Sequence, residues 1–242
     1  RKRARMAALL SGVMMASAAA GPSTVAFGRH SIQVEQEFSG AEEGSVIWDA
    51  AKSLLAHVTM LSETDDDLIR KQRVLEIGSG TGVVGIALAH LGAASVTISD
   101  KESQLPLMRR NIALNGDAEG GGRVAALEAA ALHWSPDWQE IAASLAQPDS
   151  FDLLVCCDCV YPDRPSGLAR VLLDLLALNP SATLLLSCEH RPPPGDAPSG
   201  TDHIRDFFAV MRQDCLVERV PDDKLDRRWM CDEISLWTMR LS

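Results

Sequence analysis

The sequence is poor in aromatic residues and short of cations. Aromatic residues make up 5% of its 242 residues, with one tyrosine among them, and 23 lysines and arginines stand against 33 acids, for a formal net charge of −10. An acidic chain is poorly suited to following a phosphate backbone, and this one has no basic run beyond its first five residues, so we expect no nucleic-acid partner. It also lacks an apolar run of about 18 residues, the length that crosses a membrane, so we expect no membrane partner.

Paired metal-ligand spacings are missing too. Three of the six cysteines lie in the apolar run 153–160, but no second C-x-x-C pair with histidine partners accompanies them. Because zinc sites need such pairs, we expect no metal and interpret the cysteines as reduced core residues of a cytoplasmic protein. We interpret residues 1–24 as a disordered tail. The alternative is that the acid-free stretch 1–26 contains a targeting segment, which would place the protein in an organelle.

What is present is a glycine-rich turn between an apolar strand and an apolar helix, in residues 74–86. Glycines at 78, 80 and 82 remove the side chains from one tight bend, so a ligand can lie against bare backbone N–H groups at a helix N-terminus. Asp100 closes the next apolar run, 20 residues after Gly80, where a ribose-binding carboxylate is expected. The pattern predicts a site for an adenosine-containing small molecule.

The spacing of the glycines and one acid narrow the choice of cofactor. Counted from Gly78, the dinucleotide pattern G-x-G-x-x-G fails at Val83, although an offset match from Gly80 to Gly85 survives. Glu76 precedes the first glycine by two residues, and a carboxylate there suits a cationic cofactor better than a pyrophosphate. Two alternatives remain, that Glu76 caps local backbone donors and that the chain is a nicotinamide or flavin enzyme. The run E-x-G-x-G-x-G resembles the first motif of class I S-adenosylmethionine methyltransferases.

Strand and helix patterns alternate along the chain, which predicts an α/β fold with a doubly wound, mostly parallel sheet and an antiparallel edge, in one domain over 25–242. Ligands of such sheets lie over the carboxyl ends of the strands. We expect a hairpin within 25–38, strands at 74–77, 95–99, 124–127, 151–157, 182–187, 215–220 and 233–240, and helices at 47–61, 83–91, 105–114, 168–178 and 202–212.

Polar and aromatic residues gather at the predicted strand ends. Asp158 and Tyr161, the only tyrosine, directly follow the buried strand that should neighbour the first one. Trp48 precedes the core, Trp134 follows a strand, and residues 189–191 (Glu-His-Arg) follow the next strand. The alternatives are a packing ring for Tyr161, a helix N-cap for Asp158, core positions for the tryptophans and a solvated loop for 189–191.

With these residues in place, the chain resembles methyltransferase family 16, the seven-β-strand protein lysine methyltransferases, over about residues 27–241. The resemblance rests on the hairpin before V-I-W-D-A-A, on E-I-G-S-G-T-G-V-V-G, on Asp100, on L-H-W and on D-C-V-Y as a form of the D-x-x-Y motif. The C-E-x-R run and the D-E-I-x-L-W ending look closest to the branch that methylates valosin-containing protein, an AAA ATPase; related branches methylate chaperones or translation elongation factors.

The resemblance implies a class I, Rossmann-like sheet of seven strands with a small N-terminal β-hairpin and a C-terminal edge hairpin. It also implies a monomeric enzyme that transfers a methyl group from S-adenosylmethionine to a protein lysine. The alternatives are another acceptor (a small molecule or a different residue type), an inactive cofactor-binding scaffold and a nicotinamide-dependent oxidoreductase. Asp158 and Tyr161 would position the acceptor amine. The implied cofactor-binding residues are Trp48, Glu76, Gly78, Ser79, Gly80, Asp100, Trp134 and Cys157.

Overall fold

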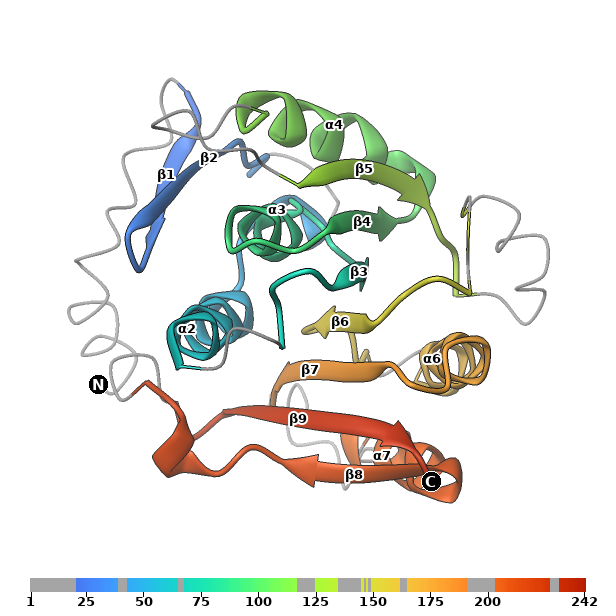
Figure 1. Ribbon diagram of the computed structural model, residues 1–242. Coiled ribbons are helices and arrows are strands. Elements are labelled where there is room, and N and C mark those ends of the chain that lie inside the picture. The colour runs from blue at the N-terminus through green and yellow to red at the C-terminus, as the bar shows by residue number, and fades with distance from the viewer. Residues whose placement is uncertain are drawn as a thin grey trace, which may run out of the picture.

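A computed structural model of the chain describes residues 21–38, 43–64, 68–116, 125–134, 145, 147, 149–161, 165–190, 203–226 and 231–242. Its centre is a seven-stranded sheet in the order β5-β4-β3-β6-β7-β9-β8 (Figure 1). Adjacent strands from β5 to β7 run parallel, and β9 runs antiparallel to both β7 and β8. The predicted fold class, with its antiparallel C-terminal hairpin, is confirmed. The strands are β3 (Arg73–Ile77), β4 (Ser95–Asp100), β5 (Ala126–Ala131), β6 (Leu153–Cys157), β7 (Thr183–Glu189), β8 (Cys215–Arg219) and β9 (Ile234–Leu241).

The central strands are apolar on both faces because helices cover both. Neighbouring residues of a strand point to opposite faces, and the core divides accordingly: Val74 and Leu153 belong to one apolar cluster, Leu75 and Leu154 to the other. The first cluster includes residues of α2 (Asp49–Thr64), α3 (Val83–His90) and α4 (Leu105–Leu114), and the second includes residues of α6 (Pro165–Leu178) and α7 (His203–Asp214). Figure 1 shows α2 and α3 on one side of the sheet and α6 on the other. None of the described helices is long and apolar enough to span a bilayer.

The strand order changes direction between β3 and β6. From β3 the chain builds outward through β4 to β5, and then returns to add β6 on the other side of β3. At such a switch point the loops that follow the two central strands separate, and the crevice between them is where open α/β sheets bind ligands. The glycine turn after β3 and the segment Asp158–Tyr161 after β6 both lie there, as the sequence predicted.

The N-terminal hairpin pairs β1 (Ser23–Phe27) with β2 (His30–Val34). Its first strand starts two residues before the domain boundary predicted at residue 25. The prediction that the second strand runs towards Phe38 is wrong. Val34 forms the last pair of the hairpin with Ser23, the first residue of β1, so the residues after Val34 have no partner strand in β1.

Another predicted boundary is displaced. The strand predicted at 124–127 is β5, Ala126–Ala131, which pairs along its whole length with Ser95–Asp100 of β4. Alanine has little intrinsic preference for strands, so its local signal was weak; here the hydrogen-bonding edge of β4 determines the strand. The helix predicted at 105–114 coincides with α4. Residue 191 and residues 1–20 of the predicted tail lie outside the described residues.

Candidate active site

The glycine turn is a closely packed cradle. Gly78, Gly80 and Gly82 have φ angles of +68°, +54° and +78°, which side chains of L-residues rarely tolerate. A Cβ added at Gly78 would collide with the Cys159 sulfur and lie 3.0 Å from Cζ2 of Trp134. The turn therefore needs glycine for two reasons: its backbone has positive φ angles, and neighbouring side chains leave no room for a Cβ.

Asp100 is tied to this turn. Its Oδ2 accepts a hydrogen bond of 2.8 Å from the N–H of Gly80, and its Oδ1 accepts one of 2.7 Å from the N–H of Lys101. The side chain is held at the end of β4 and stays partly exposed. Ser79, in the middle of the turn, donates its N–H to the carbonyl of Ser99 over 2.9 Å. The turn and the end of β4 thus form one rigid unit, as a ribose-binding arrangement needs.

Glu76 lies beneath the turn. Its side chain is 1% exposed, and Oε2 accepts a hydrogen bond of 2.9 Å from the N–H of Gly85, at the start of α3. Burial raises the pKa of Glu76 to about 8, so the carboxyl group is mostly protonated at neutral pH. The observed contact is the backbone capping that the sequence left open as the alternative, and Asp100 is the acidic side chain at the edge of the turn.

Trp48 lies on a segment that packs against the turn from the other side. The short helix η2 (Glu43–Ser45) brings the Gly44 carbonyl to 2.5 Å from where a Cβ on Gly80 would be. Trp48 donates its indole N–H to the carbonyl of Glu43 over 2.9 Å, which fixes its ring while leaving it 41% exposed. An exposed aromatic ring held beside the cradle is suited to cover an apolar part of a ligand.

Asp158 occupies a strained position directly after β6. It has a φ of +55° and is 8% exposed. Its N–H donates to the carbonyl of Ser187 over 2.7 Å, and its Oδ1 accepts a 3.2 Å bond from the N–H of Glu189. The helix α6 begins only at Pro165, so the observed bond of this carboxylate runs to β7 instead of to a helix N-terminus. Strained backbone of this kind is often found at functional sites.

Tyr161 and Trp134 form an aromatic pair over the turn. Their rings stack with centroids 6.0 Å apart and planes 25° apart, and Trp134 also contacts Gly78. Burial raises the pKa of the Tyr161 phenol, and the charges of Asp158, Glu43 and Asp100 raise it further, so the hydroxyl stays neutral. Asp158, Glu43 and Asp100 therefore all lie near enough to this phenol to raise its pKa.

Cys157 is the remaining predicted residue. It is half-buried at the end of β6, and its sulfur accepts a hydrogen bond from the Ser187 hydroxyl over 3.1 Å. Burial raises the pKa of this thiol well above its ordinary value, so it is an uncharged, weakly polar wall group. Within the described part of the chain, no group of three or more histidines, cysteines or acids is placed to hold a metal ion.

Three residues support this site although the sequence predicted no part in it for them. Cys159 lies within D-C-V-Y, and its sulfur lies 3.0 Å from the Cys157 carbonyl and 3.5 Å from that of Gly78. Gln104 and Asn111 are almost fully buried polar residues next to η2 and the turn. The burial of these two residues could have been predicted from the sequence. Asn111 lies on the apolar side of the helix predicted at 105–114, and Gln104 lies seven residues earlier, just before that helix.

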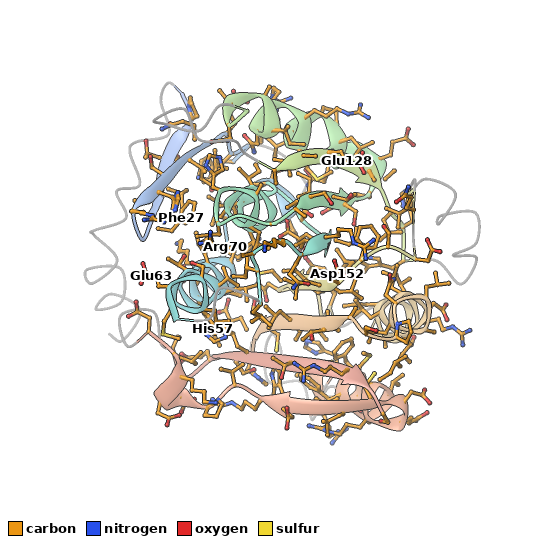
Figure 2. The ribbon with its side chains drawn as sticks, in the orientation of Figure 1. Phe27, His57, Glu63, Arg70, Glu128 and Asp152 are labelled. Carbon is orange, nitrogen blue, oxygen red and sulfur yellow. The ribbon has the colours of Figure 1, made fainter. Side chains whose placement is uncertain are left out.

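Of the predicted segment 189–191, Glu189 is the last residue of β7 and donates its N–H to Asp158, and His190 lies beside β9. Its Nε2 is 2.8 Å from the Ser235 hydroxyl, and its N–H donates to the Glu233 carbonyl over 2.6 Å. A cavity of about 430 Å³ lies elsewhere, between the hairpin turn, α2 and α3, where it is lined by Glu63, Arg70 and His90 among others. Figure 2 shows Glu63 and Arg70 on that side of the molecule, near Phe27 of the hairpin.

The geometry fits a nucleoside cofactor with a cationic group. The cradle offers backbone close to any ligand, Asp100 offers a carboxylate at its edge, and two indole rings and a neutral thiol offer apolar walls. Asp158 and Tyr161 lie where the strand after the switch point ends. The other predicted site residues lie in the glycine turn, beside it or at the ends of β4 and β6, whereas Glu76 lies beneath the turn.

Comparison with known proteins agrees with this geometry. Residues 27–214 match the family described as Lysine methyltransferase. The chain is 30% identical over 170 residues to protein N-lysine methyltransferase METTL21A of Mus musculus, covering 70% of this chain and 71% of that protein. It is 33% identical over 141 residues to EEF1A lysine methyltransferase 3 of Mus musculus, covering 57% of this chain and 53% of that protein. The solved structure of a ribosomal protein L11 methylase from Lactobacillus delbrueckii subsp. bulgaricus shares the fold, with a TM-score of 0.50, 15% identity and coverage of 90% and 97%.

Proposed function

The chain belongs to the lysine methyltransferase family, so it is an S-adenosylmethionine-dependent protein-lysine N-methyltransferase, and we propose that the crevice at the ends of β3, β4 and β6 is where it acts. The observation that carries the proposal is the position of Trp134 against Gly78, with Tyr161 stacked on Trp134 and Asp158 directly after the neighbouring strand. A cofactor seated in the cradle would have its reactive end beside the residues we assign to the acceptor.

Each wall of the crevice has a part in holding the cofactor. The backbone of Gly78, Ser79 and Gly80 would bind its amino-acid portion, and Asp100 would accept hydrogen bonds from its ribose hydroxyls. Trp48, Trp134 and Cys157 would enclose its flat and apolar parts. When bound, S-adenosylmethionine supplies a methyl group carried on a sulfonium centre.

Asp158 and Tyr161 would orient the acceptor. A lysine ammonium cannot attack until it loses a proton, and a partly desolvated site lowers its pKa. The carboxylate of Asp158 would hold the amine by a hydrogen bond, and the Tyr161 ring, fixed by Trp134, would hold the side chain through cation–π contact. The enzyme thus works mainly by position, and orientation alone accounts for large rate factors.

A ligand-binding measurement tests the cofactor assignment. Because a ligand that binds only the native state stabilises it by mass action, S-adenosylhomocysteine should raise the melting temperature in proportion to the logarithm of its concentration, and NADH should not. Stabilisation by NADH and none by S-adenosylhomocysteine would contradict the assignment and favour an oxidoreductase.

We propose that the acceptor is a protein of the chaperone, AAA ATPase or translation-factor type, and that the enzyme works as a monomer. Support comes from the resemblance to branches with such substrates and from the relative named for the translation factor EEF1A. We propose a cytoplasmic location, with an organelle as the alternative if residues 1–26 direct transport. Light scattering tests the monomer, and comparing the localisation of the tagged chain with and without residues 1–24 tests the location.

A further inference from the structure

Two buried asparagines, Asn111 in α4 and Asn115 directly after its last residue, bind the backbone at the end of β2. Asn115 accepts a 2.8 Å bond from the N–H of Gln33 and donates a 2.7 Å bond to the carbonyl of the same residue. Asn111 does the same for Glu35, accepting over 2.8 Å and donating over 3.1 Å. Each carboxamide therefore pairs with both backbone groups of one residue, as a neighbouring strand would.

The two asparagines can bind two alternate residues of the strand because four residues of a helix and two residues of a strand advance by nearly the same distance. Residues four apart on a helix are separated by about 6 Å along its axis, and residues two apart on a strand by about 6.7 Å. The two asparagines thus complete the hydrogen bonding of Gln33, which lies opposite Thr24 of β1, and of Glu35, which lies beyond the last pair of the hairpin, Ser23 with Val34. The backbone N–H and C=O groups of Gln33 and Glu35 therefore have hydrogen-bond partners, and without the asparagines they would be left unpaired.

Asn111 differs from Asn115 in one contact. Its Nδ2 also donates a 2.9 Å bond to the carbonyl of Thr81, which lies between Gly80 and Gly82 in the cradle. The corresponding second bond of Asn115, 2.7 Å long, runs to the Asn111 carbonyl within α4 itself. Both asparagines therefore hold the hairpin, but only Asn111 joins it to the glycine turn.

The segment beyond Glu35 returns to the same turn. The N–H of Glu37 donates to the Ser45 carbonyl over 2.9 Å, and Gln36 Oε1 accepts from the N–H of Ile47 over 2.9 Å. These bonds shape the segment that carries Gly44 against Gly80. The turn is thus contacted by the N-terminal segment on one side and by Asn111 on the other.

We propose that Asn111 is a positioning residue for cofactor binding, which fixes the Gly80–Gly82 backbone by joining it to the hairpin and α4. The proposal rests on the assignment of the cradle as the cofactor site. It assigns a function to the N-terminal hairpin as well, because the hairpin is the fixed body to which the turn is joined.

The two asparagines provide a matched pair of variants. Asn111→Ala and Asn115→Ala each release one residue of the hairpin, so both should lower the melting temperature. Calorimetry with S-adenosylhomocysteine should show affinity reduced on the order of tenfold in Asn111→Ala and within about twofold of the wild type in Asn115→Ala. In steady state, Asn111→Ala should raise KM for S-adenosylmethionine and leave KM for the acceptor unchanged.

A third variant keeps the bond that Asn111 accepts and removes the bonds that it donates. In Asn111→Asp the carboxylate still accepts from the N–H of Glu35 but can donate neither to the Thr81 carbonyl nor to that of Glu35, so the affinity for S-adenosylhomocysteine should fall as in Asn111→Ala. Equal affinity losses in Asn111→Ala and Asn115→Ala, or wild-type affinity in Asn111→Asp, would overturn the proposal. A wild-type chain that does not bind S-adenosylhomocysteine would instead overturn the cofactor assignment, and this proposal with it.

Amide hydrogen exchange of the wild-type chain tests the same proposal without depending on whether a variant folds. If Asn111 joins the turn to the hairpin, saturating S-adenosylhomocysteine should slow exchange of the Glu35 amide more than that of the Gln33 amide. Equal slowing of the two amides, or none in either while the ligand binds, would overturn the proposal.

Discussion

The two ends of the sheet hold their acids in different ways. At the amino ends, Asp152 just before β6 is paired with Arg73 at the start of β3, whose Nε and Nη2 donate to it over 3.0 and 2.9 Å. The hydrogen bond from the guanidinium lowers the pKa of Asp152. At the carboxyl ends, Asp100 and Asp158 accept hydrogen bonds from the peptide N–H groups of Gly80 and Glu189.

The difference shows how one sheet separates stability from binding. A guanidinium both orients a carboxylate and offsets its charge, whereas a peptide N–H orients it without adding a full positive charge. The N–H groups of Gly80 and Glu189 therefore fix Asp100 and Asp158 in position at the end of the sheet where we propose that the cofactor and the acceptor bind. Changes at the carboxyl ends should alter binding and rate, and changes at the amino ends only stability.

The largest expected effect is on turnover. Asp158→Asn keeps an oxygen that can accept from Glu189 and suits the left-handed backbone, but removes the charge. Tyr161→Ala removes the ring that stacks on Trp134. Each should lower single-turnover rates by about a hundredfold while affinity for S-adenosylmethionine stays largely unchanged. Variants that melt normally and turn over at the wild-type rate would remove the segment Asp158–Tyr161 from the active site.

The next effect compares an acid from each end. Asp100→Ala should weaken S-adenosylhomocysteine binding by roughly ten- to a hundredfold, because a hydrogen bond to a charged group contributes about 1.5–3 kcal/mol. Asp152→Asn, measured by the same calorimetry, should bind with wild-type affinity. Equal losses of affinity in both variants would contradict the claim that only the acids at the carboxyl ends of the strands contribute to cofactor binding.

Glu76 gives a pH dependence of intermediate size. Its folded-state pKa of about 8 lies above the ordinary 4.5, so the folded chain holds a proton that the unfolded chain has lost. The free energy of unfolding should therefore fall as pH rises from about 4.5 to about 8, by at most about 1.4 kcal/mol per pH unit from this group. Glu76→Gln can still accept from Gly85 and should remove that fall. Denaturant titrations from pH 5 to 8.5 measure it, and identical slopes in variant and wild type would contradict it.

The smallest effect belongs to the exposed pair at the amino end. Arg73→Ala or Asp152→Asn should change the melting temperature by no more than about 2 °C at neutral pH, because water screens partly exposed ion pairs. Since the pKa of Asp152 is lowered on folding, whatever the pair contributes is present above the ordinary pKa of Asp and disappears as pH falls through the lowered value. A large loss of stability at pH 7 would contradict this.

Most of the architecture was readable because strong local patterns agree with it. The apolar runs of β3, β6 and β7 and the glycines after β3 predicted a parallel sheet with a site at one end. Contacts between distant segments were not readable. The hairpin ends at Val34 because β1 begins at Ser23, the residue opposite. The alanine strand β5 forms because it pairs with β4 along its whole length. The side chain of Glu76 accepts from Gly85 beneath the turn, a contact between residues nine apart. No local pattern in 105–114 shows that Asn111 reaches both Glu35 and Thr81.

The most direct test is methyl transfer itself. The full chain, incubated with isotopically labelled S-adenosylmethionine and a cell extract, should label a protein band in which mass spectrometry finds a methylated lysine. The Asp158→Asn chain, matched in concentration and melting temperature, should label that band about a hundredfold more slowly. Label found on a small molecule or on a residue other than lysine, or equal labelling by the two chains, would contradict the account.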